Sequence, residues 1–324
     1  MDMKRNFFRP GSSSYLLFLI FGIMMGSVPA TSYGQVSNPQ GEVMATEVSD
    51  IWPQTLSSSH FNEFWTYHFF LEEGIKMHVT FSAANFGSLK DPVTGVRISV
   101  FNFEGETYQI SREYSLERLI QDEERVRFQV SDEREVWFEG ALPEAHRVRV
   151  KTGKGGLSFD IDMDFSNIVQ GVKWANGLYS IGDEPVGIYT HIPYAEVSGS
   201  VAINGVRKEL SGTAYMDHTF QNETTTHLMH SGYRFISHQD ADNWDITYAL
   251  LPEEREDTRV IGHRITRENG EQRLQSAYQI MDMQRKRDLG ERFAHTMQLY
   301  FLELPLEEGG ANLATIQRTQ DDER

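Results

Sequence analysis

Residues 212–222 read Gly212-Thr213-Ala214-Tyr215-Met216-Asp217-His218-Thr219-Phe220-Gln221-Asn222 and place a tyrosine, an acid and a histidine within four consecutive positions. The stretch otherwise has the pattern of a β-strand, whose side chains alternate between two faces. Tyr215, Asp217 and Thr219 are therefore predicted to share one face, and the residues between them, including His218, the other. Because an unpaired buried carboxylate is costly, an inward-facing Asp217 needs either a structural hydrogen-bond partner or a chemical role.

The sequence around this stretch continues the pattern of a β-rich chain. Three runs precede it: Tyr189-x-His191-Ile192-Pro193, Val197-Ser198-Gly199-Ser200-Val201-Ala202-Ile203-Asn204-Gly205 and Leu210-Ser211-Gly212. Far upstream, an aromatic run ends at a turn: Phe64-Trp65-Thr66-Tyr67-His68-Phe69-Phe70-Leu71-Glu72-Glu73-Gly74. Strands that recur every 8–15 residues or so, with turn signals between them, are typical of barrels and sandwiches.

Together these runs resemble a known superfamily. The pattern Gly-x-x-Tyr-x-Asp-His at 212–218 is similar to the signature of the AttH, carotenoid 1,2-hydratase (hydroxyneurosporene synthase) and survival-factor proteins. The run from Phe64 resembles their opening strand, W-x-Y-x-x-x-L-x-x-G, and the resemblance extends to about Leu302. It implies a mainly β fold of two tandem lipocalin-like (calycin) β-barrel domains with few short helices. After His218 the hydratases often carry Asn-Trp-Gly, where this chain has Thr219-Phe220-Gln221.

Pattern and composition divide the chain into five segments. They are a signal peptide (1–34), a loose leader (35–59), an N-terminal lipocalin-like domain (60–170), a C-terminal lipocalin-like domain (171–306) and an acidic flexible tail (307–324). The leader is predicted to hold one short strand near Val48–Trp52. A helix is predicted over Leu116–Glu124, with Ser115 as its N-cap. No internal repeat is clear in the sequence, so the duplication is implied by the resemblance.

The first 34 residues have the pattern of an export signal. Basic residues at positions 4, 5 and 9 precede an apolar core of 12 residues, Tyr15 to Gly26, which is short for a bilayer span. The runs Val28-Pro29-Ala30 and Ser32-Tyr33-Gly34, which end in small residues, offer two candidate cleavage sites, and an uncleaved membrane anchor is the alternative. The sequence therefore predicts an exported protein, periplasmic or secreted, with no integral membrane segment after cleavage.

The charge and the cysteine count limit the partners and the means of stabilisation. The net charge is −17, which argues against nucleic acid and anionic membrane surfaces as partners. The chain has no cysteine, so an exported form must rely on its hydrophobic core instead of disulfides. The predicted partner is a hydrophobic small molecule.

Two patterns suggest metal sites, and neither has the required spacing. Leu157–Phe165 alternates apolar residues with Ser and three Asp, but it lacks the glycine and closing glutamate of a calcium loop and is predicted to be a strand with a solvated face. Four histidines lie close in sequence: His218, His227, His230 and His238. They lack the spacing of a zinc or iron site, so neither a metal nor a cofactor is predicted.

The resemblance implies Tyr215 and Asp217 as candidates for acid catalysis, and the neighbouring His218 completes the predicted catalytic set. A buried carboxyl with a raised pKa can protonate an alkene, and a tyrosine can orient that carboxyl or stabilise a cation with its ring. The residues predicted to bind a ligand are Tyr189, His191, Tyr233, Phe235 and Trp244.

Three functions stay open from the sequence. The first is an exported lipocalin-like protein that binds an isoprenoid, polyketide or lipid in an aromatic-lined cavity, as barrels of about eight strands can. The second is a lyase, hydratase, cyclase or isomerase that acts on an unsaturated hydrophobic substrate with Asp217 as general acid. The third, with weaker support, is a non-catalytic envelope interaction protein.

Overall fold

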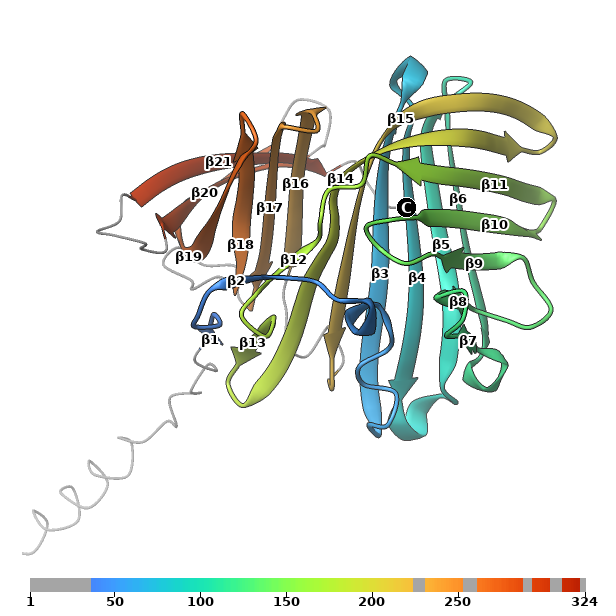
Figure 1. Ribbon diagram of the computed structural model, residues 1–324, viewed down its shortest axis with the longest axis horizontal. Helices are drawn as coiled ribbons and strands as arrows, with labels where there is room; N and C mark the ends of the chain where they lie inside the picture. The colour runs from blue at the N-terminus through green and yellow to red at the C-terminus, as the bar shows by residue number, and fades with distance from the viewer. Residues whose placement is uncertain (1–35, 224–230, 253–260, 288–292, 304–310, 321–324) are drawn as a thin grey trace, which may run out of the picture. The chain divides into compact units, whose positions relative to one another are not determined.

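The computed structural model describes residues 36–223, 231–252, 261–287, 293–303 and 311–320 (Figure 1). Within these ranges the strands pair into two antiparallel sheets, which confirms the predicted mainly β fold. The longest helical segment of the described chain is the four-residue 3-10 helix η1 (Val48–Ile51). None of the described helices is long and apolar enough to cross a membrane.

The first sheet has 15 strands, and its main path runs β6-β5-β4-β3-β15-β14-β11-β10-β9-β8-β7. Its strands are β1 (Val36–Ser37), β2 (Val43–Ala45), β3 (His60–Leu71), β4 (Lys76–Phe86), β5 (Val93–Phe103), β6 (Glu106–Ser115), β7 (Ile120–Asp122), β8 (Arg127–Gln129), β9 (Val136–Glu139), β10 (His146–Lys154), β11 (Leu157–Ser166), β12 (Val172–Trp174), β13 (Leu178–Ile181), β14 (Glu184–Ile203) and β15 (Val206–Gln221). Residues 212–221 of the central stretch 212–222 thus lie in β15, between β14 and β3.

The second sheet has six strands joined in sequence order. They are β16 (Ser231–Asp240), β17 (Asn243–Leu251), β18 (Ile261–Glu268), β19 (Glu271–Arg287), β20 (Phe293–Glu303) and β21 (Ala311–Gln320). Three further 3-10 helices, η2 (Glu72–Gly74), η3 (Gly87–Leu89) and η4 (Leu116–Arg118), connect strands of the first sheet.

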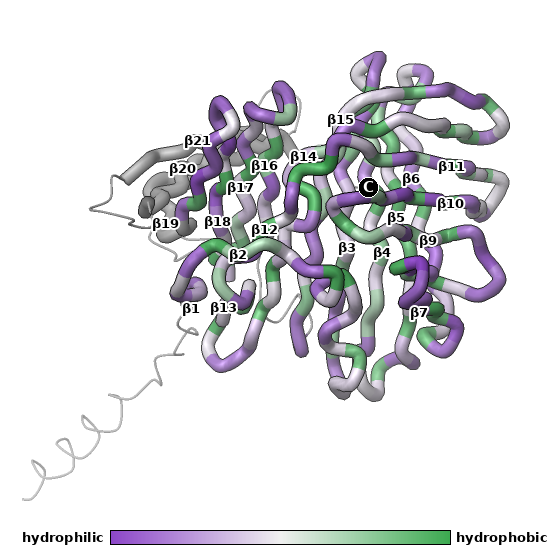
Figure 2. Tube along the Cα trace, in the orientation of Figure 1, coloured by the Kyte–Doolittle hydropathy of each residue, from purple (hydrophilic) through white to green (hydrophobic). Residues whose placement is uncertain are grey.

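Period-two alternation builds the core of the first sheet, as the hydropathy along its strands indicates (Figure 2). In β11, Phe159, Ile161 and Met163 are buried, and the aspartates between them lie on the other face. That face carries cross-strand ion pairs with β10, including Asp162 with Arg147, so the predicted polar face is correct. We define the first core as the buried cluster that includes Trp65, Tyr67, Phe69, Phe81, Phe128, Phe138, Ile161, Met163, Ala214 and Met216.

Strands β14 and β15 also contribute to a second core, on their other face. We define the second core as two buried clusters: Trp174, Tyr179, Ile181, Val186, Ile188, Tyr248, Leu250 and Ile261, and Val172, Tyr194, Tyr215, Trp244, Ile246 and Ile265. Tyr215 belongs to the second core and its neighbour Met216 to the first. Strand β15 is therefore a wall that is buried on both faces.

The structure differs from the helix predicted over Leu116–Glu124. Only η4 (Leu116–Arg118) is helical there, and the chain then extends into β7 (Ile120–Asp122). The Leu116 backbone N–H bonds to the carbonyl of Pro92, and β7 pairs with β8. Backbone bonding to neighbouring segments thus outweighs the local helix propensity of this stretch.

The segment predicted as a loose leader is instead held against the sheet. Strand β2 pairs with β12, and the predicted strand near Val48–Trp52 is the helix η1. Side chains of β3 and β15 bond to its backbone, as described below. At the other end, β21 (Ala311–Gln320) pairs with β20 within the predicted flexible tail, because an edge strand offers free backbone partners. The boundary near residue 170 stays a prediction, and β11 pairs with β14 across it.

Candidate functional site

The glycine that opens the central stretch is required by a close approach of two strands. A Cβ on Gly212 would lie 2.1 Å from the backbone carbonyl oxygen of Phe70 on β3, which is closer than real Cβ atoms come. Gly212 therefore lets β15 pair with β3, opposite Leu71. This pairing fixes the register of the residues that follow.

The predicted alternation of the stretch is confirmed. Tyr215 lies opposite His68 of β3, and Asp217 lies opposite Thr66 of β3 and Thr190 of β14. These side chains lie on the face of the second core, whereas His218 lies on the face of the first, stacked on Trp65 with ring centroids 4.4 Å apart. The two polar neighbours Asp217 and His218 therefore belong to two separate sites.

Asp217 is fully buried and forms a two-point ion pair with Arg234 of β16. Arg234 donates from Nε to Oδ2 at 2.6 Å and from Nη2 to Oδ1 at 3.0 Å. Nη2 also donates to the hydroxyl oxygen of Tyr248 at 3.1 Å, and that hydroxyl lies 2.8 Å from the hydroxyl of Thr219. The side chain of Arg234 is 24% exposed, so this network reaches solvent through its cation.

The electrostatics of this pair are those of two ionised groups. Burial acts to lower the pKa of the Arg234 guanidinium, but the Asp217 carboxylate raises this pKa by more, and the net shift is upward. The guanidinium also lies 4.5 Å from the ring centroid of Tyr248, in a cation–π contact. Burial raises the pKa of the Tyr248 hydroxyl, which stays a neutral hydrogen-bonding group.

Tyr215 and two histidines form the neighbouring part of this site. The ring of His68 lies 5.9 Å from that of Tyr215 and 4.3 Å from that of His78 on β4. Within the described residues, the buried His68 Nε2 has no hydrogen-bond partner, and the buried Tyr215 hydroxyl has Thr190 close by but no well-formed hydrogen bond. Burial, His78 and the charge of Arg234 hold the pKa of His68 well below its ordinary value. Burial and the charge of Arg234 lower the pKa of His78 to about 4.

On the other face of β15, His218 forms a buried ion pair with Glu63 of β3. His218 Nε2 lies 3.0 Å from Glu63 Oε2, and Nδ1 lies 3.1 Å from the backbone carbonyl oxygen of Asp50. Both ring nitrogens thus face acceptor oxygens. Since neither nitrogen is free, His218 has no position from which to exchange a proton with a substrate.

Glu63 also holds the leader segment in place. The backbone N–H groups of Gln54 and Thr55 and the Thr55 hydroxyl donate to its carboxylate at 2.5–3.0 Å. Burial acts to raise the pKa of the Glu63 carboxyl, but His218 and these hydrogen bonds lower it by more. Trp65 Nε1 also donates to the carbonyl of Ile51 at 2.8 Å. We call residues 46–55, which these bonds hold against β3 and β15, the strap.

A lysine secures the strap from β12. Lys173 Nζ donates to both carboxylate oxygens of Asp50 at 2.7 Å and lies 5.3 Å from the ring centroid of Tyr189. The side chains of Lys173 and Asp50 are 13% and 10% exposed. The arrangement on this face is a closed structural network.

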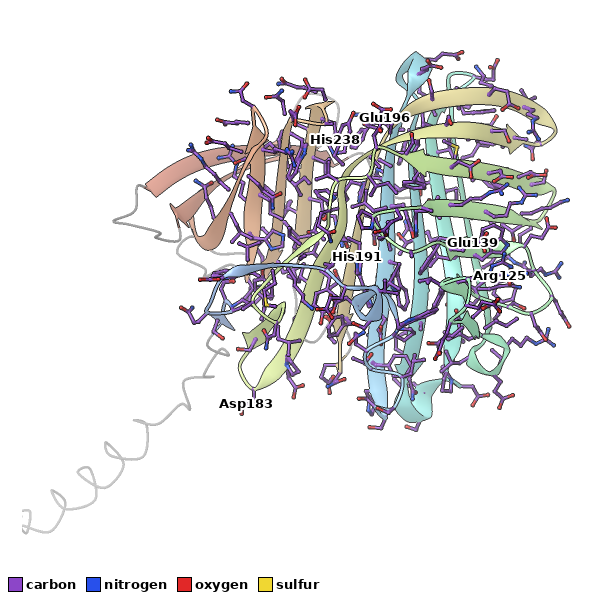
Figure 3. All side chains as sticks on the ribbon, in the orientation of Figure 1. Arg125, Glu139, Asp183, His191, Glu196 and His238 are labelled. Atoms are coloured by element: carbon purple, nitrogen blue, oxygen red, sulfur yellow. The ribbon has the colours of Figure 1, made fainter. Side chains whose placement is uncertain are left out.

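The structure distributes the predicted site residues over several surfaces. Tyr189 and His191 of β14 lie with His218, at ring distances of 6.0 Å and 5.9 Å (His191 is labelled in Figure 3). Trp244 lies in the second core with Tyr215. The remaining pair, Tyr233 and Phe235, alternate with the inward-facing Arg234 and so lie on the opposite face of β16. Phe235 is 46% exposed. His227 and His230 lie outside the described residues.

Two central residues of these networks were not predicted from the sequence: Arg234 and Glu63. Glu63 shares the period-two face of Phe61 and Trp65, and an acid on an aromatic face is a signal for a buried pair. Arg234 stands between two aromatic residues in a strand-like run, which places it on the face opposite to theirs. Only the three-dimensional contacts between strands show which acid each cation meets.

Two buried Tyr–His pairs predict how stability depends on pH. In the first core, the Tyr67 hydroxyl lies 2.8 Å from His146 Nε2. In the second core, the Tyr179 hydroxyl lies 2.7 Å from His263 Nδ1. Burial lowers the pKa of His146 to about 3 and that of His263 to about 4. In the unfolded chain a histidine takes up a proton near pH 6.5. As the pH falls from about 6.5 toward the lower folded pKa values, the free energy of unfolding is therefore expected to decrease.

The expected slope is about 1.4 kcal/mol per pH unit for each such histidine. Urea unfolding at pH 7.5, 6.0 and 5.0 measures it in the wild type and in His146→Gln. The variant should lose less stability on acidification than the wild type, whereas His60→Gln, at an exposed histidine, should keep the wild-type slope. Equal slopes in all three proteins would contradict the assignment.

Comparison with known proteins bears on the fold. No protein-family model matches the chain, and no curated protein matches it in sequence. An AttH-like protein from Nitrosomonas europaea superimposes with a TM-score of 0.56 at 13% identity, over 84% of this chain and 93% of that one. CghA, solved with Sch210972, gives a TM-score of 0.45 at 10% identity, over 80% and 88% of the two chains.

A third structure, kievitone hydratase from Nectria haematococca, gives a TM-score of 0.42 at 14% identity, over 86% of this chain and 96% of that one. The similarity to the Nitrosomonas europaea protein supports the resemblance that the sequence indicated, and at this identity it concerns the fold. The chain has the lipocalin-like fold of the AttH-type proteins.

Proposed function

We propose that this protein is an exported carrier that binds a hydrophobic small molecule beside the Asp217–Arg234 pair. The observation that carries the proposal is the two-point ion pair itself, set among Tyr215, Tyr248 and Trp244 of the second core. Ligand sites are mostly apolar and aromatic with a few polar groups that fix orientation. The basic and apolar pattern of residues 1–34 supports export.

The same ion pair favours binding over acid catalysis. A general acid must present a proton to its substrate, whereas both carboxylate oxygens of Asp217 already accept hydrogen bonds from Arg234. His218 does not supply the missing proton to this site, because it lies on the other face and is held by Glu63 and the Asp50 carbonyl. A carrier whose binding site is lined by the Asp217–Arg234 ion pair therefore fits the geometry better than a lyase with Asp217 as its general acid.

The test is to identify what the protein holds and whether the compound changes. Native mass spectrometry and solvent extraction of the purified mature protein should yield an apolar compound, and the protein should return it chemically unchanged after incubation. Conversion of the compound by the wild type, slowed roughly 100-fold or more in Asp217→Asn, would establish the lyase instead. Protein free of any apolar compound, and unable to take up a neutral apolar dye, would favour the envelope interaction protein.

A further inference from the structure

The ligand site carries polar groups that the ion pair leaves unused. Burial raises the pKa of the Tyr215 hydroxyl, and Thr190 of the neighbouring strand is near enough to act against that rise. Tyr215 is fully buried, and its hydroxyl has no well-formed hydrogen bond within the described residues. His68 Nε2, on the strand opposite, also lacks one, and the two rings lie 5.9 Å apart. Buried polar groups in native proteins are nearly always bonded, to protein, water or ligand. Two such groups on neighbouring rings therefore point to an oxygen atom from outside the chain as their partner.

Among the described residues, the charges around this place sum to zero. We call Tyr215, Asp217, Arg234, His68 and His78 the Tyr215 cluster. Its single carboxylate and its single guanidinium neutralise each other through two hydrogen bonds. The two imidazoles are uncharged at neutral pH, because burial and Arg234 hold the pKa of His68 well below its ordinary value and bring that of His78 to about 4. Burial keeps the Tyr215 hydroxyl protonated by raising its pKa.

Other charges near the cluster do not alter this balance. Lys76 and Arg97 face His78 from β4 and β5, but both side chains are exposed to solvent. Two aromatic residues flank the cluster: Phe70 of β3 lies opposite Thr213 of β15, and the exposed Phe101 lies 5.3 Å from His78. A carboxylate brought to the Tyr215 hydroxyl would be desolvated beside Asp217, and the described part of the chain offers it no unpaired buried cation, which makes its binding costly. A neutral oxygen would gain a donor at no such cost.

We infer that the hydrophobic ligand is uncharged and carries a hydroxyl or carbonyl oxygen, which bonds to the Tyr215 hydroxyl and His68 Nε2. This inference rests on the proposed carrier function and specifies the ligand class of the same site. It selects alcohols, aldehydes and ketones with apolar bodies, and it excludes fatty acids and other apolar carboxylates.

A matched pair of fluorescent probes tests the inference. 1-Pyrenebutanol and 1-pyrenebutanoic acid share a body and differ in the head group, and the acid is ionised at pH 7.5. The alcohol is expected to bind the full mature protein about tenfold or more tighter than the acid. Tyr215→Phe should weaken the alcohol about 3- to 10-fold, as loss of one hydrogen bond does, and leave the acid unchanged. Tyr108→Phe, on β6, is the control and should change neither affinity.

The outcomes separate the two claims. If neither probe binds, the carrier function itself fails. If the acid binds as tightly as the alcohol or tighter, the carrier function stands and the inference of an uncharged ligand is overturned. If the alcohol is preferred but Tyr215→Phe binds it like the wild type, the oxygen is not held at Tyr215 and the assigned position is overturned.

Discussion

Arg234→Leu is expected to lower the free energy of unfolding by about 3–5 kcal/mol, because it leaves the buried Asp217 carboxylate without its cation. In this pair the Asp217 side chain is fully buried and the Arg234 side chain is 24% exposed. The Tyr248 hydroxyl also loses a donor, which adds to the cost. Urea unfolding at pH 7.5, followed by tryptophan fluorescence, measures the loss.

Two further variants make this measurement interpretable. Arg147→Leu removes a more exposed arginine from its pair with Asp162 and should cost about 1 kcal/mol or less. The double variant Asp217→Leu with Arg234→Leu removes both charges and should recover much of the stability lost in the single variant. If Arg234→Leu is no less stable than Arg147→Leu, the buried Asp217 does not depend on Arg234 for its stability.

The second large effect is expected at Glu63, where Glu63→Gln should cost about 3–5 kcal/mol. The neutral amide leaves the buried His218 without its counter-ion, and its NH₂ group cannot accept the bonds that Gln54 and Thr55 donate to the carboxylate. The strap should then detach, so limited proteolysis within residues 46–55 should become faster. Glu135→Gln, at an acid that is 59% exposed, is the matched control and should behave as the wild type.

Acid should reduce the difference between wild type and Glu63→Gln. The pKa of Glu63 is lowered in the folded protein, so its stabilising contribution is complete above the ordinary value of 4.5 and is lost as pH falls through the lower folded value. Unfolding curves of both proteins between pH 7.5 and 3.5 test this sign. A difference that grows on acidification would mean that Glu63 is protonated in the folded state.

The alternation of side chains along β15 could be predicted from the sequence, because it depends only on the geometry of one strand. The assignment of Tyr215 and Asp217 to one face and His218 to the other followed from period two, and the structure confirms it. The same rule could not show that each face meets a different core. The sequence prediction therefore placed Asp217 and His218 in one catalytic set, which the opposite faces of β15 separate.

Partners from distant segments were beyond the reach of sequence pattern. Arg234 reaches Asp217 only because β16 of the second sheet lies against β15, and no local periodicity encodes that contact. The strap was predicted as loose because its own residues show little periodicity, whereas its order comes from Glu63, Trp65 and His218 on other strands. Polar loop composition reports the absence of regular structure, which differs from the absence of anchoring.

Burial of β14 and β15 in both cores has a consequence for cooperativity. Removing the two strands would leave β3 and β11 with unpaired edges in the first sheet and would strip the second core of Val186, Ile188 and Tyr215. Within the described residues, neither half of the chain has a complete hydrophobic core of its own. A fragment that ends near residue 170 should consequently expose edge strands and aggregate, and the intact chain should melt in a single calorimetric transition.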